Sequence, residues 1–173
     1  MSVSGGRGVG DALQRGRWTG DTSDGTNLQV RARSIQYRRC ITRVIEFIRQ
    51  EYPHRATSLI VELTQEQRAN QLLYPGSTHD LRYDRINPAV MKHFIRKIIR
   101  DYGSYTASQT RQYPSYSNIR KFHDAILKCS NVAGLQLSAN YKHEMKEYMI
   151  RVKWWIAALR STRGYAQYMV FNL

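Results

Sequence analysis

Apolar side chains recur at helical spacing in four long stretches of the chain. They stand three or four positions apart, so the rotation of about 100° per residue gathers them on one side of each helix. The stretches span about residues 34–52, 88–102, 115–129 and 138–161. Four helices that each bury one face predict an all-α fold, a compact bundle of four to five helices. The side chains expected to face inward are Tyr37, Ile41, Val44, Ile45, Ile48, Met91, Phe94, Ile95, Ile98, Ile99, Tyr102, Ile119, Phe122, Ile126, Cys129, Tyr141, Met145, Tyr148, Val152, Trp155, Ile156 and Leu159.

Residues that favour helix boundaries stand at the ends of these stretches. Pro53 follows the first stretch directly, and a residue before proline avoids the helical conformation. Asn87 is the expected N-cap of the second helix, Ser115 or Ser117 that of the third, and Ser138 that of the fourth. These residues support the predicted helices independently of the apolar pattern.

The segment between the first two helices, residues 54–87, follows no single periodicity. Residues 59–63 fit a short strand or a buried turn, and residues 64–73 fit a short helix. Residues 79–86 alternate weakly, as an extended segment does. The pattern leaves the structure of this segment open.

The composition divides the chain into one domain and two tails. Residues 1–27 are rich in Gly, Ser, Thr and Asp and poor in apolar side chains, so burial cannot offset the entropy lost on ordering. We expect a disordered, Gly/Ser-rich tail there. Residues 28–164 then form the helical domain, and residues 165–173 an apolar C-terminal tail.

A large excess of positive charge indicates a polyanionic partner. The chain has 27 Lys and Arg against 13 Asp and Glu, a formal net charge of +14. Most of these cations are arginine, whose guanidinium group matches phosphate oxygens and guanine edges bidentately. Nucleic acid is therefore the leading partner, and an assembly protein with a solvated basic face is the alternative.

The basic side chains gather on helix faces opposite the expected core. This placement predicts contacts with DNA phosphates, with limited sequence reading by one helix near a groove. Trp154 and Ile150 lie off the main apolar stripe of the last helix, so they pack within the bundle, on another domain or on a missing continuation of this chain. The candidate DNA-binding residues are Arg38, Arg39, Arg43, Arg96, Lys97, Arg100, Arg120, Lys121, Lys142, Lys146 and Lys153.

The sharpest local motif is His79-Asp80-Leu81-Arg82. A histidine and an arginine three apart can hold a scissile phosphate, but such chemistry also needs a nucleophile and usually a second arginine. The motif lies upstream of the best-defined helices. We expect no catalytic residue; the alternative is a lone phosphoryl-transfer enzyme that uses His79, Arg82 and a tyrosine.

The remaining chemistry-bearing residues indicate no cofactor. The other four histidines form none of the spacings that orient a metal, so no metal site is expected. Cys40 and Cys129 fall near apolar arcs and are expected to be small core side chains in a reducing compartment. No run of about 18 apolar residues occurs, so no membrane partner is expected.

Three pieces of the chain carry a family resemblance: NPAVMKHFIRKII, then PSYSNIRKFHDAILK, then LSANYKHEMKEYMIRVKWWIAALR. The stretch from Pro88 through Gly164, about half of the chain, resembles the N-terminal SAM-like (core-binding) domain of tyrosine recombinases and integrases, especially the recombinase-like proteins of eukaryotic mobile elements. In that family this domain clasps one side of duplex DNA, and a separate C-terminal domain supplies the residues of strand exchange. Nothing here matches the second domain, and the motif at residues 79–82 stands before the helical domain rather than after it. No catalytic residue is therefore carried over.

These observations predict a DNA-binding module, which the resemblance interprets as a truncated or domesticated recombinase. It would act in DNA recombination or integration beside a missing C-terminal domain or a partner protein, in the nucleus or another intracellular compartment that contains DNA. The alternative is an RNA-binding structural protein of a ribonucleoprotein such as an organellar ribosome.

Overall fold

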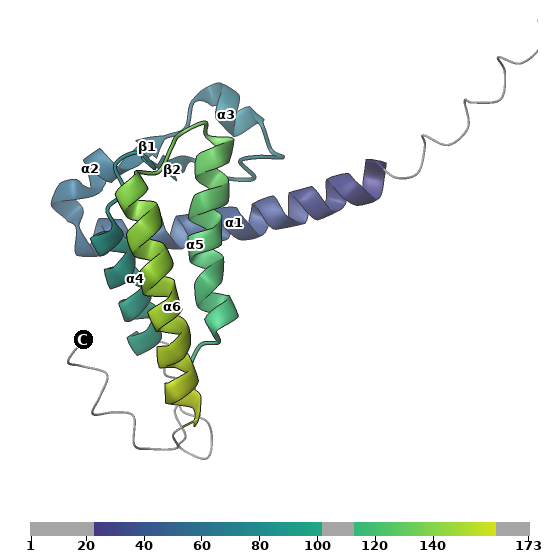
Figure 1. Cartoon of the computed structure of the whole chain (residues 1–173). Coiled ribbons are helices and arrows are strands. Elements are labelled where there is room, and N and C mark those ends of the chain that lie inside the picture. The colour runs from purple at the N-terminus through teal and green to yellow at the C-terminus, as the bar shows by residue number, and fades with distance from the viewer. Residues whose placement is uncertain (1–22, 102–112, 162–173) are drawn as a thin grey trace, which may run out of the picture.

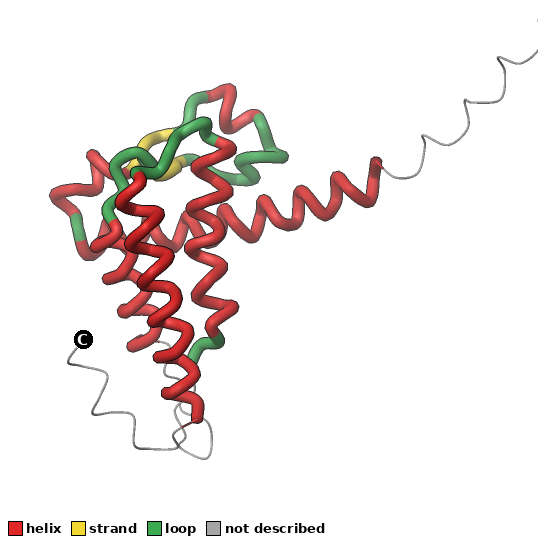
Figure 2. The backbone as a smooth tube through the Cα atoms, viewed as in Figure 1, coloured by secondary structure: helices red, strands yellow, loops and turns green. Residues whose placement is uncertain are grey.

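The computed structural model describes residues 23–101 and 113–161. These residues are mostly helical, which confirms the predicted all-α fold (Figures 1 and 2). The elements in chain order are α1 (Ser23–Glu51), the 3₁₀ turn η1 (Pro53–Arg55), α2 (Ala56–Leu59), β1 (Ile60–Glu62), α3 (Gln65–Ala69), β2 (His79–Leu81), α4 (Pro88–Asp101), α5 (Tyr116–Val132) and α6 (Ala139–Ser161).

Three of the long helices lie side by side, and α1 crosses them (Figure 1). The helix α1 packs mainly on α5, while α6 contacts both α4 and α5. The short elements α2, α3, β1 and β2 gather at one end of the bundle (Figure 1). This arrangement leaves one side of α6 without a neighbour among the described elements.

The core consists largely of the side chains that the apolar pattern predicts. Eighteen of the predicted inward residues are buried, and Tyr37, Ile98 and Trp155 are partly buried at the edge of the core. Tyr102 lies outside the described residues. Phe47, which the pattern did not single out, is also buried, and its ring lies 5.2 Å from that of Phe94.

Phe47 is buried in addition to these eighteen side chains. Its ring begins a line of edge-to-face aromatic contacts that joins three helices. Phe47 of α1 meets Phe94 of α4, and Phe94 lies 5.1 Å from Phe122 of α5. Such pairs stabilise a core beyond the area that they bury. The line holds the C-terminal part of α1 against α4 and α5.

Side-chain caps stand where the sequence predicts them. The hydroxyl of Ser115 accepts a hydrogen bond from the backbone N–H of Asn118, and that of Ser138 accepts one from Tyr141. The side-chain oxygen of Asn87 accepts one from the N–H of Ala89. Each cap satisfies a donor that the first turn of a helix leaves free. Between the two options for the third helix, the structure therefore selects Ser115.

The irregular segment contains a small antiparallel sheet. Strand β1 pairs with β2 in a register that sets Ile60 opposite Leu81 and Val61 opposite Asp80. Of the two options for residues 59–63, the strand is correct, and the extended prediction for residues 79–86 holds over β2. Leu81 is buried against the helices, so the sheet closes one end of the core.

The predicted start of the domain is wrong, because α1 begins at Ser23 and includes part of the expected tail. The N-terminal half of α1 extends beyond the other helices (Figure 1), and Arg31 and Arg33 on it are exposed. A helical turn that packs on nothing needs no apolar stripe, so periodicity detects only the buried half. The rest of the expected N-terminal tail and the apolar tail of residues 165–173 lie outside the described residues.

Candidate nucleic-acid interface

Arg38 corrects the expected interface, because it is buried rather than outward-facing. Its guanidinium forms an ion pair with Asp80 and donates through Nε to the carbonyl oxygen of Leu73 at 3.1 Å. A side chain held in this way cannot reach a phosphate. The sequence carried the signal: Arg38 stands three and seven positions before Ile41 and Ile45, on the buried side of α1.

The motif at residues 79–82 is explained by the same contact. Asp80 accepts hydrogen bonds from the backbone N–H of Leu81 and from the hydroxyl of Tyr83, at 2.8 and 2.5 Å. Burial, followed by the Asp80 charge, raises the pKa of Tyr83 well above its usual value, so this phenol stays a donor. Asp80 therefore has a structural role. The His79 ring forms a hydrogen bond with the hydroxyl of its neighbour Thr78.

Three other candidates already have carboxylate partners. Lys97 lies 2.8 Å from a carboxylate oxygen of Glu51, Arg100 lies 3.1 Å from Asp101, and Arg120 lies 3.4 Å from Asp124. The Glu51 partner also raises the pKa of Lys97. Each pair would have to open, or share its cation, before a phosphate could bind. These three are therefore weaker phosphate ligands than their exposure suggests.

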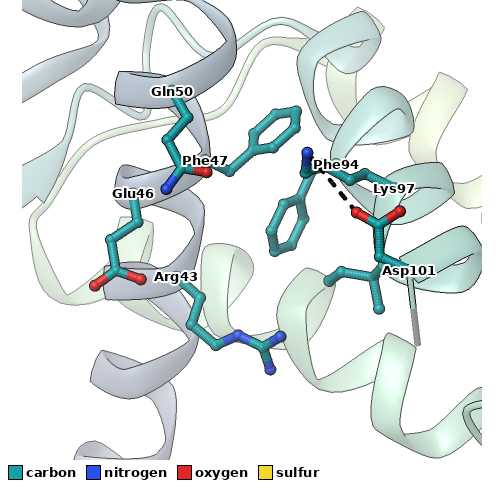
Figure 3. A pocket seen from close by; sticks show the side chains of 8 residues that line it. Arg43, Glu46, Phe47, Gln50, Phe94, Lys97 and Asp101 are labelled. Carbon is teal, nitrogen blue, oxygen red and sulfur yellow. Dashed lines mark ion pairs between the residues drawn. The ribbon is translucent and has the colours of Figure 1, made fainter. Parts of the chain in front are cut away.

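A shallow groove between α1 and α4 has a mixed electrostatic character (Figure 3). Its volume is about 240 Å³, and the rings of Phe47 and Phe94 lie at its base. Two cations and two carboxylates line it together with uncharged side chains, so its charges largely cancel. We see no strong preference for an anion there. The lining residues are Arg43, Glu46, Phe47, Gln50, Phe94, Lys97, Ile98 and Asp101.

Several candidates on α1, α4 and α5 remain exposed. The guanidinium of Arg43 lies over the ring of Phe122 at 5.2 Å, and that of Arg96 lies 6.0 Å from the ring centre of Tyr148. These ring contacts leave the positive charge uncompensated. Arg39 and Lys121 are exposed as well, and Lys121 contacts Asn118 rather than a carboxylate.

The most continuous array of cations runs along α6. Its members are exposed, and within the described residues none forms an ion pair with a carboxylate. Their spacing of 4, 7 and 7 positions keeps them on one line of the helix, since seven residues make nearly two turns. Arg160 is the member that the sequence prediction of DNA contacts omitted. We call the α6 ridge the set Lys142, Lys146, Lys153 and Arg160.

The titratable groups in the core do not form a reactive cluster. Burial raises the pKa of Cys40, and it raises the pKa of Cys129 to about 11. Both thiols are buried, as predicted for core cysteines, and unionised thiols are poor nucleophiles. Across residues 23–101 and 113–161, no three His, Cys, Asp or Glu side chains gather in a way that could hold a metal ion.

Comparison with protein families, curated proteins and solved structures found no match to this chain. Among the described helices, none is long and apolar enough to cross a membrane.

Proposed function

We propose that this protein is a DNA-binding module that contacts the phosphate backbone through basic helix faces. The observation that carries the proposal is the α6 ridge, in which four exposed cations lie in line without a carboxylate partner in the described part of the chain. A fold that gathers like charges on one line loses some stability through their repulsion. A polyanion that neutralises them would remove that repulsion on binding.

The net charge supports a polyanion as the partner, and the distribution of the charge supports a defined binding surface on the bundle. Arg39, Arg43 and Lys121 offer further exposed cations where α1 meets α5. The two groups of cations provide contacts on two helix surfaces of one bundle. The role fits the clasp that the resemblance to recombinase core-binding domains implies, and the proposal is limited to binding, without strand exchange.

A salt titration of duplex binding tests this function. Each phosphate that the protein neutralises releases counterions, so log affinity falls by about 0.9 per contact for each unit of log salt. Four ridge contacts alone predict a slope of roughly −3.6. The measurement is fluorescence anisotropy of a labelled duplex over a range of salt concentrations. No binding at low salt, or an affinity that salt leaves unchanged, would refute the proposal.

Competition with structured RNA is the second arm of the same experiment. Duplex DNA that displaces RNA from the protein supports the DNA-binding assignment. If RNA binds much more tightly than DNA, the result would contradict the DNA-binding assignment and would support the alternative of a structural role in a ribonucleoprotein.

A further inference from the structure

Two large apolar side chains on α6 are exposed to solvent. Trp154 is 71% exposed and Ile150 is 49% exposed, although the other large apolar residues of α6 pack into or against the core. They stand four positions apart, so they lie one turn from each other on the same side of the helix. Burial of Trp154 and Ile150 within the bundle, one of the three options that the sequence left open, is therefore excluded. Exposed apolar side chains grouped in this way are typical of a surface that binds another molecule.

The two flanks of this pair differ in charge. At 100° per residue, Lys146 and Lys153 fall on the side of Ile150 that faces away from Glu147. The opposite flank carries the exposed Glu147 and Arg151, and Glu144, which forms an ion pair with Lys92, so its charges nearly cancel. The outer side of α6 thus has a basic edge, an apolar centre and a mixed edge that includes two carboxylates.

We propose that the outer side of α6 binds an unpaired DNA strand. This inference rests on the proposed function and deepens it. The α6 ridge binds the phosphates of the strand, while Trp154 stacks on one base and Ile150 contacts the adjacent base. Stacking on aromatic side chains beside a basic track is how proteins hold single strands without reading their sequence.

The difference in charge between the two flanks of α6 favours the binding of a single strand over insertion into the groove of a duplex. A helix in a groove has a phosphate backbone on both sides. One of those backbones would face the flank on which Arg151 and Lys92 only balance Glu147 and Glu144, so that flank would attract it much less than the ridge attracts the other. A single strand has its phosphates on one edge and its bases on the other, which matches the basic edge and the apolar centre.

The length of the ridge and the net charge narrow the choice of partner further. Arg160 stands eighteen positions after Lys142, so the ridge spans about 27 Å, enough for several phosphates in a row.

A second copy of this chain would bring another basic surface, from a chain of net charge +14, against the ridge. Repulsion between the two ridges opposes that contact.

The test compares Trp154→Ala with the wild-type chain on two labelled ligands, an oligothymidylate strand and a duplex of equal length. Loss of one stacked base predicts at least about a fivefold fall in affinity for the strand. Affinity for the duplex should stay within about twofold, since phosphate contacts carry it. Trp154→Phe keeps an aromatic face and should recover most of the strand affinity. Leu72→Ala, which removes an exposed apolar side chain from another surface, is the matched control and should change neither affinity.

The outcomes separate this inference from the proposed function. A wild-type chain that binds neither ligand refutes both. Duplex binding that falls with salt, together with a strand affinity that Trp154→Ala leaves unchanged, refutes only the stacking inference and assigns the exposed pair to another partner, such as an acidic protein surface. Equal losses on strand and duplex also refute it, because stacking on unpaired bases acts on the strand alone. Thermal melting of each variant checks that the fold is intact.

Discussion

The guanidinium of Arg38 lies 2.7 Å from the carboxylate of Asp80, and both side chains are 4% exposed. This ion pair joins α1 to β2, and its two residues stand 42 positions apart in the sequence. The ring of Tyr74 covers the guanidinium at 4.3 Å from its centre. Burial is the largest single effect on the pKa of Arg38 and lowers it, but the charge of Asp80, the nearby Cys129 and Tyr83, and the hydrogen bond to Asp80 together raise the pKa above its usual value.

Replacement of Arg38 by methionine should destabilise the protein strongly. The variant leaves Asp80 charged and buried without its partner, which typically reduces the free energy of unfolding by about 3–5 kcal/mol. Urea denaturation followed by circular dichroism measures the change. The double variant R38M/D80L removes both charges and should recover part of the loss. A single variant that loses less than about 1 kcal/mol would contradict the structural role of this pair.

His123 should make the protein less stable as the pH falls. Burial lowers the pKa of His123, the charge of Asp124 opposes this without reversing it, and the charge of Arg120 lowers the pKa further. The unfolded chain therefore binds the proton first, at a pKa of about 6.5, and stability is lost from there down to the folded pKa. His123→Leu removes this contribution, so the stability advantage of wild type over the variant should shrink on acidification. Denaturation curves at several pH values measure it, and parallel pH profiles would contradict the prediction.

The two thiols should be unreactive in the folded protein. Cys40 and Cys129 are buried, and burial raises both pKa values, so little thiolate exists at mildly alkaline pH. Ellman's reagent should therefore react with neither thiol until denaturant is added, after which both should react. Rapid reaction of one thiol without denaturant would show that the bundle opens locally near it. The variants Cys40→Ala and Cys129→Ala identify which thiol reacts.

The sequence predicted the helices well because each long helix buries one face. The core of α5, from Ile119 to Cys129, follows directly from that periodicity. Two features escaped it for physical reasons. The exposed half of α1 has no buried stripe to reveal it, and the pairing of β1 with β2 depends on contacts between segments that are distant in the sequence.

The candidate interface was predictable in part. Charge and helical phase place Lys142, Lys146 and Lys153 on one line, and the structure shows them exposed. Charge alone could not show that Arg38 is used inside the fold, since its acidic partner lies on a strand that the sequence left undefined. Nor could it show which exposed cations have carboxylate neighbours, because the Lys97–Glu51 pair joins two different helices.

The most direct test of the account removes charge from the ridge and compares the effect with equal charge removal elsewhere. The variant Lys142→Gln/Lys146→Gln/Lys153→Gln and the control Arg49→Gln/Arg55→Gln/Lys128→Gln each lose three exposed cations. Anisotropy titrations with one labelled duplex over a range of salt concentrations give the affinity and its salt slope. The account predicts that the ridge variant loses affinity at low salt and that its slope becomes shallower by roughly 2.7, while the control stays close to wild type. Equal losses in the two variants would show that net charge alone attracts DNA and would contradict a defined interface on α6.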